Sequence, residues 1–335
     1  MKHVFLVHSN TTLIVANGVI KKEKLQKEDI LFLLTRGFKN SFDYSNIDGD
    51  IFFQELEGIN YLNFFKGWKQ IKMIDNFIKN KINNDFTIYL PHVAHPFFQI
   101  LYTNERCVAV HILEEGVNCL SKKLYDNSSS LKFSFINLFF NILGLYGKRR
   151  FFRVRSNIDF FIKKEVQTIF YYLTPNAFSE VSLFEKKEIA LDFHELNFME
   201  KKINDNSTIF VFEAIVEQGN LSMDLFFKSI YEVLNDIQSY KIYVKFHPAQ
   251  NEDNIRKIYD ILSEKIEVIV LDNNVILEFE FLRSKKLIIY GFTSSLLHYA
   301  RLFGHKVKSY SFLWEKDKMF ANFRSSNDFS IPSDK

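Results

Sequence analysis

Three short polar clusters, each following an apolar stretch, carry the side chains of this chain that could do chemistry. They are Glu114-Glu115-Gly116, His247-Pro248 and Thr293-Ser294-Ser295. A carboxylate can act as a general base, and a histidine can hold a phosphate or donate a proton. Hydroxyls at a helix start suit an anionic group. Together the clusters predict one active site that removes a proton and binds a phosphate-containing ligand.

The first cluster ends the apolar run at 107–113. Adjacent residues of an extended chain point to opposite sides, so only one of Glu114 and Glu115 is expected to face a given substrate. Close carboxylates raise each other's proton affinity, which suits a base, and Gly116 permits a tight turn. An acidic helix start is the alternative, and Glu-Glu-Gly alone does not exclude it.

The second cluster follows the apolar run at 241–246. Pro248 prevents that strand from continuing, which places His247 at the carboxyl edge of a sheet. Lys245 lies two residues earlier on the same side, so the pair could contact phosphate. A hydrogen-bonded structural histidine is the alternative interpretation.

The third cluster follows the run at 286–290 and opens a helix. Hydroxyls and unbonded amides at a helix start form an anion site, although every helix also needs an ordinary N-cap. Glu278, in the segment before this strand, could bind a ribose diol, as acidic residues do after a Rossmann strand.

Strands and helices alternate along both halves of the chain, as a parallel sheet requires. Ligands of such sheets bind beyond the carboxyl ends of the strands, where all three clusters fall. We therefore predict an α/β fold with Rossmann-like domains at 1–200 and 207–325. The expected strands are 3–8, 29–35, 85–91, 107–113, 208–214, 241–246, 267–271, 286–290 and 306–310, and the expected C-terminal helices are 223–237, 252–264 and 294–303.

A segment near 131–164 combines phenylalanine with basic residues, including Arg149, Arg150, Arg153 and Arg155. Such a mixture suits a membrane interface, where aromatic rings enter the headgroup region and cations meet anionic lipid. A core-packed helix followed by a solvated basic turn is one alternative. The lining of an anionic substrate groove is another.

Length and composition limit the other classes of function. At 335 residues the chain favours two domains, and its 47% hydrophobic and 25% charged residues are an ordinary globular balance. A net charge of +3 does not indicate nucleic acid. The two cysteines lack the spacing of a zinc site and fit a reducing compartment. Neither a signal peptide nor an apolar run of about 18 residues is recognisable.

In this order and spacing, Glu-Glu-Gly, His-Pro and Ser-Ser resemble the D/E-D/E-G, HP and S-S/T motifs of bacterial sialyltransferases. That group covers glycosyltransferase family 52, the first choice here, and its relatives in families 80, 38 and 97. The resemblance spans roughly residues 85 to 310 and is strongest for the last two motifs. It implies a GT-B fold, in which two Rossmann-like domains face a central cleft. It also implies CMP-sialic acid as donor, inversion at the anomeric carbon, and neither a metal nor another cofactor.

The resemblance also implies roles for individual residues. Glu114 would be the base that deprotonates the acceptor hydroxyl, and His247 would contact the CMP phosphate. Ser294 and Ser295 would hold the same phosphate, and Glu278 the ribose. In family 52 a carboxylate of the second domain has been assigned as base. The corresponding candidates here are Glu213, Glu217 and Asp224, and the remaining predicted donor-site residues are Glu115, Gly116, Pro248 and Thr293.

The implied acceptor is a terminal sugar, galactose first, on a lipid-linked bacterial surface glycan such as lipooligosaccharide, O-antigen or capsule. The implied location is the cytoplasm or the inner face of the cytoplasmic membrane. No basic helix or aromatic-basic β-platform stands out, so no nucleic-acid partner is expected. A homodimer is one open possibility. Three alternatives remain. They are a teichoic-acid-type transferase that uses CDP-glycerol or CDP-ribitol, a polysialyltransferase, and a non-catalytic membrane-surface protein.

Overall fold

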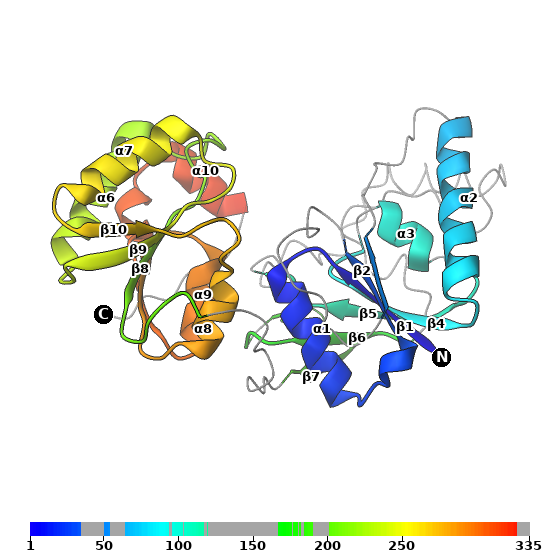
Figure 1. The fold of residues 1–335 in the computed structure, drawn as a ribbon. Helices are drawn as coiled ribbons and strands as arrows, with labels where there is room; N and C mark the ends of the chain where they lie inside the picture. Colours follow the sequence, from blue (N-terminus) through cyan, green and yellow to red (C-terminus); the bar gives the residue numbers. More distant parts are fainter. Residues whose placement is uncertain are drawn as a thin grey trace. The chain divides into compact units, whose positions relative to one another are not determined.

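Two separate parallel sheets organise the chain (Figure 1). One lies in the unit Met1–Asp192 and the other in the unit Phe193–Lys335. The predicted α/β fold with two Rossmann-like sheets is therefore confirmed, and every strand expected from the sequence is present. The predicted membrane-contacting segment at 131–164 lies outside the described residues. The computed structural model describes residues 1–34, 50–53, 64–93, 96–102, 104–116, 119, 167–175, 177–179, 181, 184–189 and 201–326.

The sheet of the first unit has seven strands in the order β3-β2-β1-β4-β5-β6-β7, all parallel. The strand order reverses between β1 and β4, and in open α/β sheets ligands bind at such a switch point. The strands are β1 (Lys2–Val7), β2 (Ile30–Leu34), β3 (Asp50–Phe53), β4 (Phe86–Leu90), β5 (Cys107–Leu113), β6 (Ile169–Tyr172) and β7 (Glu185–Glu188).

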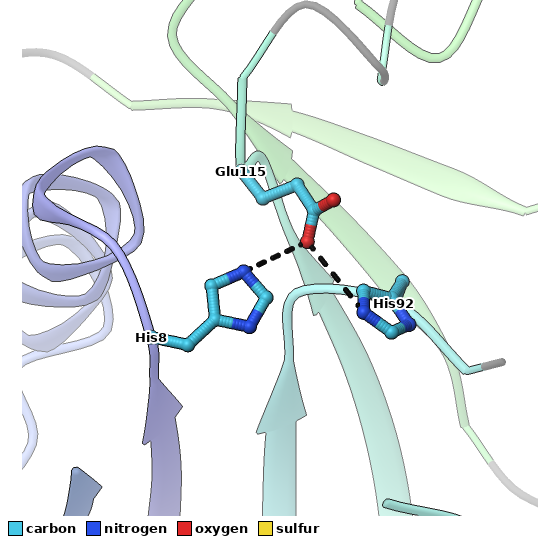
Figure 2. A group of neighbouring side chains, drawn as sticks. All are labelled: His8, His92 and Glu115. Carbon is cyan, nitrogen blue, oxygen red and sulfur yellow. Dashed lines mark ion pairs between the residues drawn. The ribbon is translucent and has the colours of Figure 1, made fainter. Parts of the chain in front are cut away.

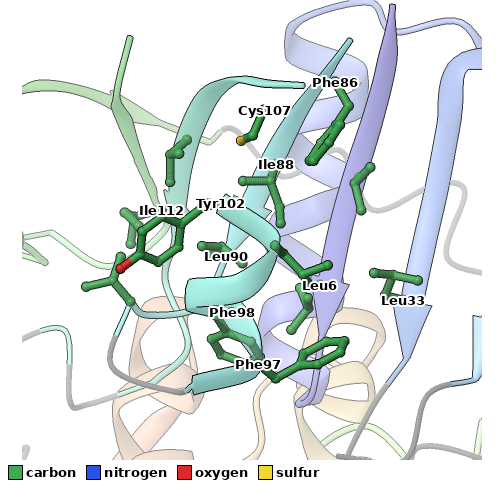
Figure 3. Close-up of a cluster of buried hydrophobic side chains, with 14 of the residues drawn as sticks. Leu6, Leu33, Phe86, Ile88, Leu90, Phe97, Phe98, Tyr102, Cys107 and Ile112 are labelled. Carbon is green, nitrogen blue, oxygen red and sulfur yellow. The ribbon is translucent and has the colours of Figure 1, made fainter. Parts of the chain in front are cut away.

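Helices cover both faces of this sheet, so its central strands are apolar on both sides, and all five residues of β2 and of β4 are buried. Phe97 and Phe98 of one helix pack against Leu6 and Leu90 on one face (Figure 3). On the other face, Ser9 caps a helix by accepting a hydrogen bond from the Thr12 N–H (3.2 Å). The helices are α1 (Asn10–Lys22), η1 (Lys27–Asp29), α2 (Phe64–Lys81) and α3 (Pro96–Tyr102).

The second sheet has five parallel strands in the order β10-β9-β8-β11-β12. Its switch point lies between β8 and β11. Two apolar cores, one on each face, hold the helices to the sheet. The strands are β8 (Thr208–Val211), β9 (Lys241–Lys245), β10 (Glu267–Val270), β11 (Ile288–Gly291) and β12 (Lys306–Ser309). The helices are α6 (Met223–Asp236), α7 (Glu252–Ser263), α8 (Leu277–Arg283), α9 (Ser295–Leu302), η7 (Ser311–Trp314) and α10 (Lys318–Ser326).

No helix within the described ranges is long and apolar enough to cross a membrane.

Candidate functional site

Glu115 lies with two histidines at the carboxyl edge of the first sheet, next to its switch point (Figure 2). His8, His92 and Glu115 follow the ends of β1, β4 and β5, which are neighbours in the sheet. The Glu115 Oε2 atom is 3.0 Å from His8 Nε2 and 3.9 Å from His92 Nε2. The sequence analysis included Glu115 but missed both histidines.

An apolar floor supports the two imidazoles. The ring of the fully buried Phe98 lies 4.9 Å from the His92 ring and 6.2 Å from the His8 ring, measured between centroids. The side chains of His8, Glu115 and His92 are only 4%, 12% and 19% exposed. The three side chains therefore form a largely buried polar cluster.

Glu114 occupies a different environment from its neighbour. Its side chain is buried, and Oε2 accepts hydrogen bonds from the backbone N–H groups of Leu173 (2.7 Å) and Thr174 (2.9 Å). Oε1 accepts a further hydrogen bond from the Thr174 hydroxyl. The carboxylate therefore ties the end of β5 to the loop after β6. The base role of Glu114 stays a prediction, and these bonds favour a positioning role instead.

Gly116 makes the turn that follows these carboxylates. Its φ of +144° lies in a region that favours glycine. Its carbonyl accepts a hydrogen bond from the Cys119 N–H (3.1 Å), and the Cys119 thiol accepts one from the Glu115 N–H (3.4 Å). These bonds fix the backbone at Glu115. The predicted contact of Gly116 with the donor stays a prediction.

His247 follows β9 and is exposed. Hydrogen bonds within residues 247–250 fix the orientation of its ring. Its Nδ1 accepts a hydrogen bond from the Ala249 N–H (3.1 Å), and its backbone N–H donates one to Gln250 Oε1 (2.8 Å). The neutral ring therefore carries its proton on Nε2. Partial desolvation lowers the pKa of His247, although Glu217 acts in the opposite sense. The loop thus offers a neutral Nε2–H donor.

Two candidate bases of the second unit, Glu217 and Asp224, differ in their contacts. Glu217 Oε1 accepts hydrogen bonds from the Asn251 N–H (3.1 Å) and the Asn254 side-chain amide (2.9 Å), which anchors the start of α7. Asp224 is exposed in the first turn of α6. Glu217 therefore has a structural task near His247.

The start of α9 lies at the switch point of the second sheet. Ser294 is the N-cap, and its Oγ accepts a hydrogen bond from the Leu296 N–H (3.3 Å). Thr293 donates from both its N–H and its hydroxyl to Glu213 Oε1, each at 2.7 Å. Glu213 follows β8, so this carboxyl group joins β8 to the start of α9 and positions the paired serines.

The Glu213 carboxyl group is a weaker acid than an ordinary glutamate. Within the described residues its buried Oε2 atom has no hydrogen-bond partner, and burial raises the pKa of Glu213 to about 7. The bonds from Thr293 lower this pKa but do not outweigh burial. Glu213 therefore holds its proton over a pH range in which an ordinary glutamate is ionised.

Glu213→Gln is expected to remove a pH dependence of stability. A folded-state pKa of about 7 against 4.5 for an ordinary Glu means that the folded protein binds the extra proton between these values. Stability from this group is complete below pH 4.5 and is lost as pH rises to about 7, by up to roughly 3 kcal/mol. Urea unfolding at several pH values should show a flatter profile for the variant, whose amide oxygen still accepts from Thr293. Parallel profiles would contradict this.

Glu278 lies in the first turn of α8 and acts on Lys245. The Lys245 Nζ donates to the carbonyls of Asp272 (2.6 Å) and Val275 (2.9 Å). Burial lowers the pKa of Lys245, and the charges of Glu278 and Asp272 raise it. Lys245 therefore positions the loop before α8. The ribose contact of Glu278 and the donor contact of Pro248 stay predictions.

A family comparison covers both units and all three motifs. The model of the alpha-2,8-polysialyltransferase (POLYST) family matches residues 3–312. The chain belongs to this family. It is therefore a glycosyltransferase of the sialyltransferase type. No curated protein sequence matches this family member.

Solved structures of low sequence identity share the fold of this polysialyltransferase-family protein. The sialyltransferase of Photobacterium damsela aligns with a TM-score of 0.53 at 14% identity, over 98% of this chain and 80% of that one. Its GT-B domain (Photobacterium damselae, residues 113–497) aligns with a TM-score of 0.52 at 15% identity, over 96% of each chain. The UDP-GlcNAc 2-epimerase of Methanocaldococcus jannaschii gives 0.55 at 10% identity, over 92% and 83%. These alignments confirm the GT-B type of fold.

Proposed function

We propose that this protein transfers sialic acid from CMP-sialic acid to a hydroxyl of a terminal sugar on a glycan, with inversion at the anomeric carbon. The observation that carries the proposal is the family match over residues 3–312, which contains all three predicted motifs. The narrower resemblance to glycosyltransferase family 52 stays a prediction. The location at the cytoplasmic face of a membrane also stays a prediction.

The second unit supplies the donor site in this proposal. The leaving CMP phosphate accepts hydrogen bonds from the Nε2–H of His247 and from Ser294 and Ser295 at the start of α9. Ser295 is the first residue of α9 and its side chain is half-buried, so a ligand at the helix start can reach its hydroxyl. Hydrogen bonds from these donors stabilise the negative charge of a single phosphate, so the proposed transfer includes no metal.

The first unit supplies the base. Transfer from the tertiary anomeric centre of sialic acid passes through an oxocarbenium-like state, so the acceptor hydroxyl must lose its proton as the new bond forms. We assign this proton to Glu115 rather than to Glu114. Glu115 has a His8 imidazole at 3.0 Å that orients its carboxylate, whereas the Glu114 oxygens are occupied by Leu173 and Thr174.

The family name favours an acceptor that itself ends in sialic acid, linked through an α-2,8 bond. Terminal galactose on a lipid-linked bacterial surface glycan is the acceptor that the motif resemblance implied. Both are hydroxyl acceptors that one carboxylate base can serve. We therefore place terminal sialosides first and terminal galactosides second.

The purified chain is expected to release CMP from CMP-sialic acid in the presence of terminal sialosides or galactosides. Mass spectrometry should show acceptors extended by sialic acid, with repeated addition for a polymerising enzyme. CDP-glycerol and CDP-ribitol serve as donor controls, and His247→Ala as the catalytic control. Turnover of a CDP donor alone would replace this proposal with the teichoic-acid type.

A further inference from the structure

We propose that His8, His92 and Glu115 bind a zinc ion, and that the bound ion switches the transferase off (Figure 2). Zinc binding follows from the side chains alone, whereas the inhibition rests on the proposed function of Glu115. Zinc is here a regulatory ligand and not a cofactor of the transfer.

The backbone places one ligand just after the end of each of three neighbouring strands. Their ligand atoms, His8 Nε2, His92 Nε2 and a Glu115 carboxylate oxygen, all lie within 4.8 Å of one another. The separations from Glu115 Oε2 are 3.0 and 3.9 Å. Ligands about 2.0–2.1 Å from a tetrahedral zinc ion are separated by about 3.3 Å. Small side-chain rotations therefore suffice to close the site on the ion.

The donor set selects for zinc over the common hard cations. Two imidazole nitrogens and one carboxylate oxygen form a set typical of zinc sites that keep one coordination position open. Mg²⁺ and Ca²⁺ prefer oxygen ligands and bind such a set weakly. Low exposure of the three side chains, at 4%, 19% and 12%, also means that little water competes for the ion.

One feature limits the affinity. The buried Nδ1 of His8 has no hydrogen-bond partner in the part of the chain that the structure describes. Zinc-binding histidines usually donate their second ring N–H, and loss of that bond weakens metal binding by about 10–100-fold. The site is therefore expected to release zinc to a chelator, as a regulatory site must.

Coordination of zinc withdraws Glu115 from its other role. The carboxylate lone pair that would accept the acceptor's proton forms the bond to the metal instead. Zinc bound to one carboxylate oxygen also draws electron density from the other, so Glu115 is a much weaker base while the ion is bound.

Calorimetric titration of the full, tag-free, chelator-treated chain with Zn²⁺ tests the binding. We expect one site per chain, unchanged in excess Mg²⁺ and lost in His8→Ala, His92→Ala and Glu115→Gln. His3→Ala is the matched control and should keep the site, since His3 lies in β1, the strand before His8, but contacts Tyr89 (3.0 Å) instead. Retention of the site in both His8→Ala and His92→Ala would overturn the proposal.

Two further measurements cover the other outcomes. Titration of the unaltered chain with Co²⁺ should give a visible absorption band that Zn²⁺ abolishes, which needs no variant to fold. Zinc should also inhibit CMP release, and a chelator should reverse the inhibition. In His92→Ala, the ratio of the rate without zinc to the rate with zinc should fall towards 1. A chain that binds zinc and transfers sialic acid equally well with it would overturn the inhibition. A chain that binds zinc but has no transferase activity would overturn the proposed function and leave the zinc site standing.

Discussion

Glu115→Gln is expected to lower the turnover of sialyl transfer by about two to four orders of magnitude, the usual scale for loss of a general base. The amide has the shape of the carboxylate but cannot accept the acceptor's proton. The amide of this variant can still form a hydrogen bond with His8, whose ring lies 3.0 Å from the native carboxylate. The Michaelis constant for CMP-sialic acid should change little, because the proposed donor contacts lie in the second unit. Initial rates of CMP release measure both constants.

Glu114→Gln is the matched control for that experiment. The change weakens the charge-assisted bonds from Leu173 and Thr174, so we expect a loss of roughly 1–3 kcal/mol in stability. Turnover should fall by less than about tenfold at a temperature where the variant is folded. Thermal unfolding measured beside the kinetics separates the two effects. If Glu114→Gln removes turnover and Glu115→Gln does not, Glu114 is the base.

His247→Ala is the second change expected to have a large effect, a loss of about two orders of magnitude in turnover. The Nε2–H of the neutral ring, fixed by the bond from Ala249 to Nδ1, would stabilise the negative charge that builds up on the leaving phosphate. Since the pKa of His247 is lowered, the ring is already neutral at pH 7. A rise from pH 7 to 8 should therefore not abolish this contact, and turnover should not fall on its account.

His247→Gln should recover part of that loss, because its side-chain amide also donates a hydrogen bond. Pro248→Ala, next to it, changes the loop without removing the donor and should have a much smaller effect. Turnover and the affinity for CMP, measured separately, show whether His247 acts mainly in the transition state. Near-native turnover of His247→Ala would remove the residue from the chemistry.

The positions of the strand ends could be read from the sequence, and these positions located Glu115, His247 and Ser294 at sheet edges. Apolar runs broken by proline, glycine or charge mark such ends reliably. The histidines beside Glu115 could not be found this way. His8 and His92 gather only because β1, β4 and β5 are neighbours, and strand order depends on long-range packing.

The separate roles of Glu114 and Glu115 could not be predicted from the sequence either. A strand end shows that Glu114 and Glu115 point apart, but not which of them meets the loop after β6. The bond between Glu213 and Thr293 joins residues 80 positions apart in the chain, across the strand-order reversal at β8 and β11. Short-range sequence patterns do not indicate which distant residues will form a hydrogen bond.

The bonds of Glu114 fix the two described ends of the chain between β5 and β6. The turn at Gly116 follows β5, and Gln167, which pairs with Ala109 of β5, precedes β6. Glu114 ties the two sides together through Thr174, independently of whatever lies between them. Lengthening a loop between fixed ends costs little, about 0.6 kcal/mol for each doubling. Glu114 therefore keeps residues 114–116 in place beside β6 even if the number of residues between 116 and 167 changes.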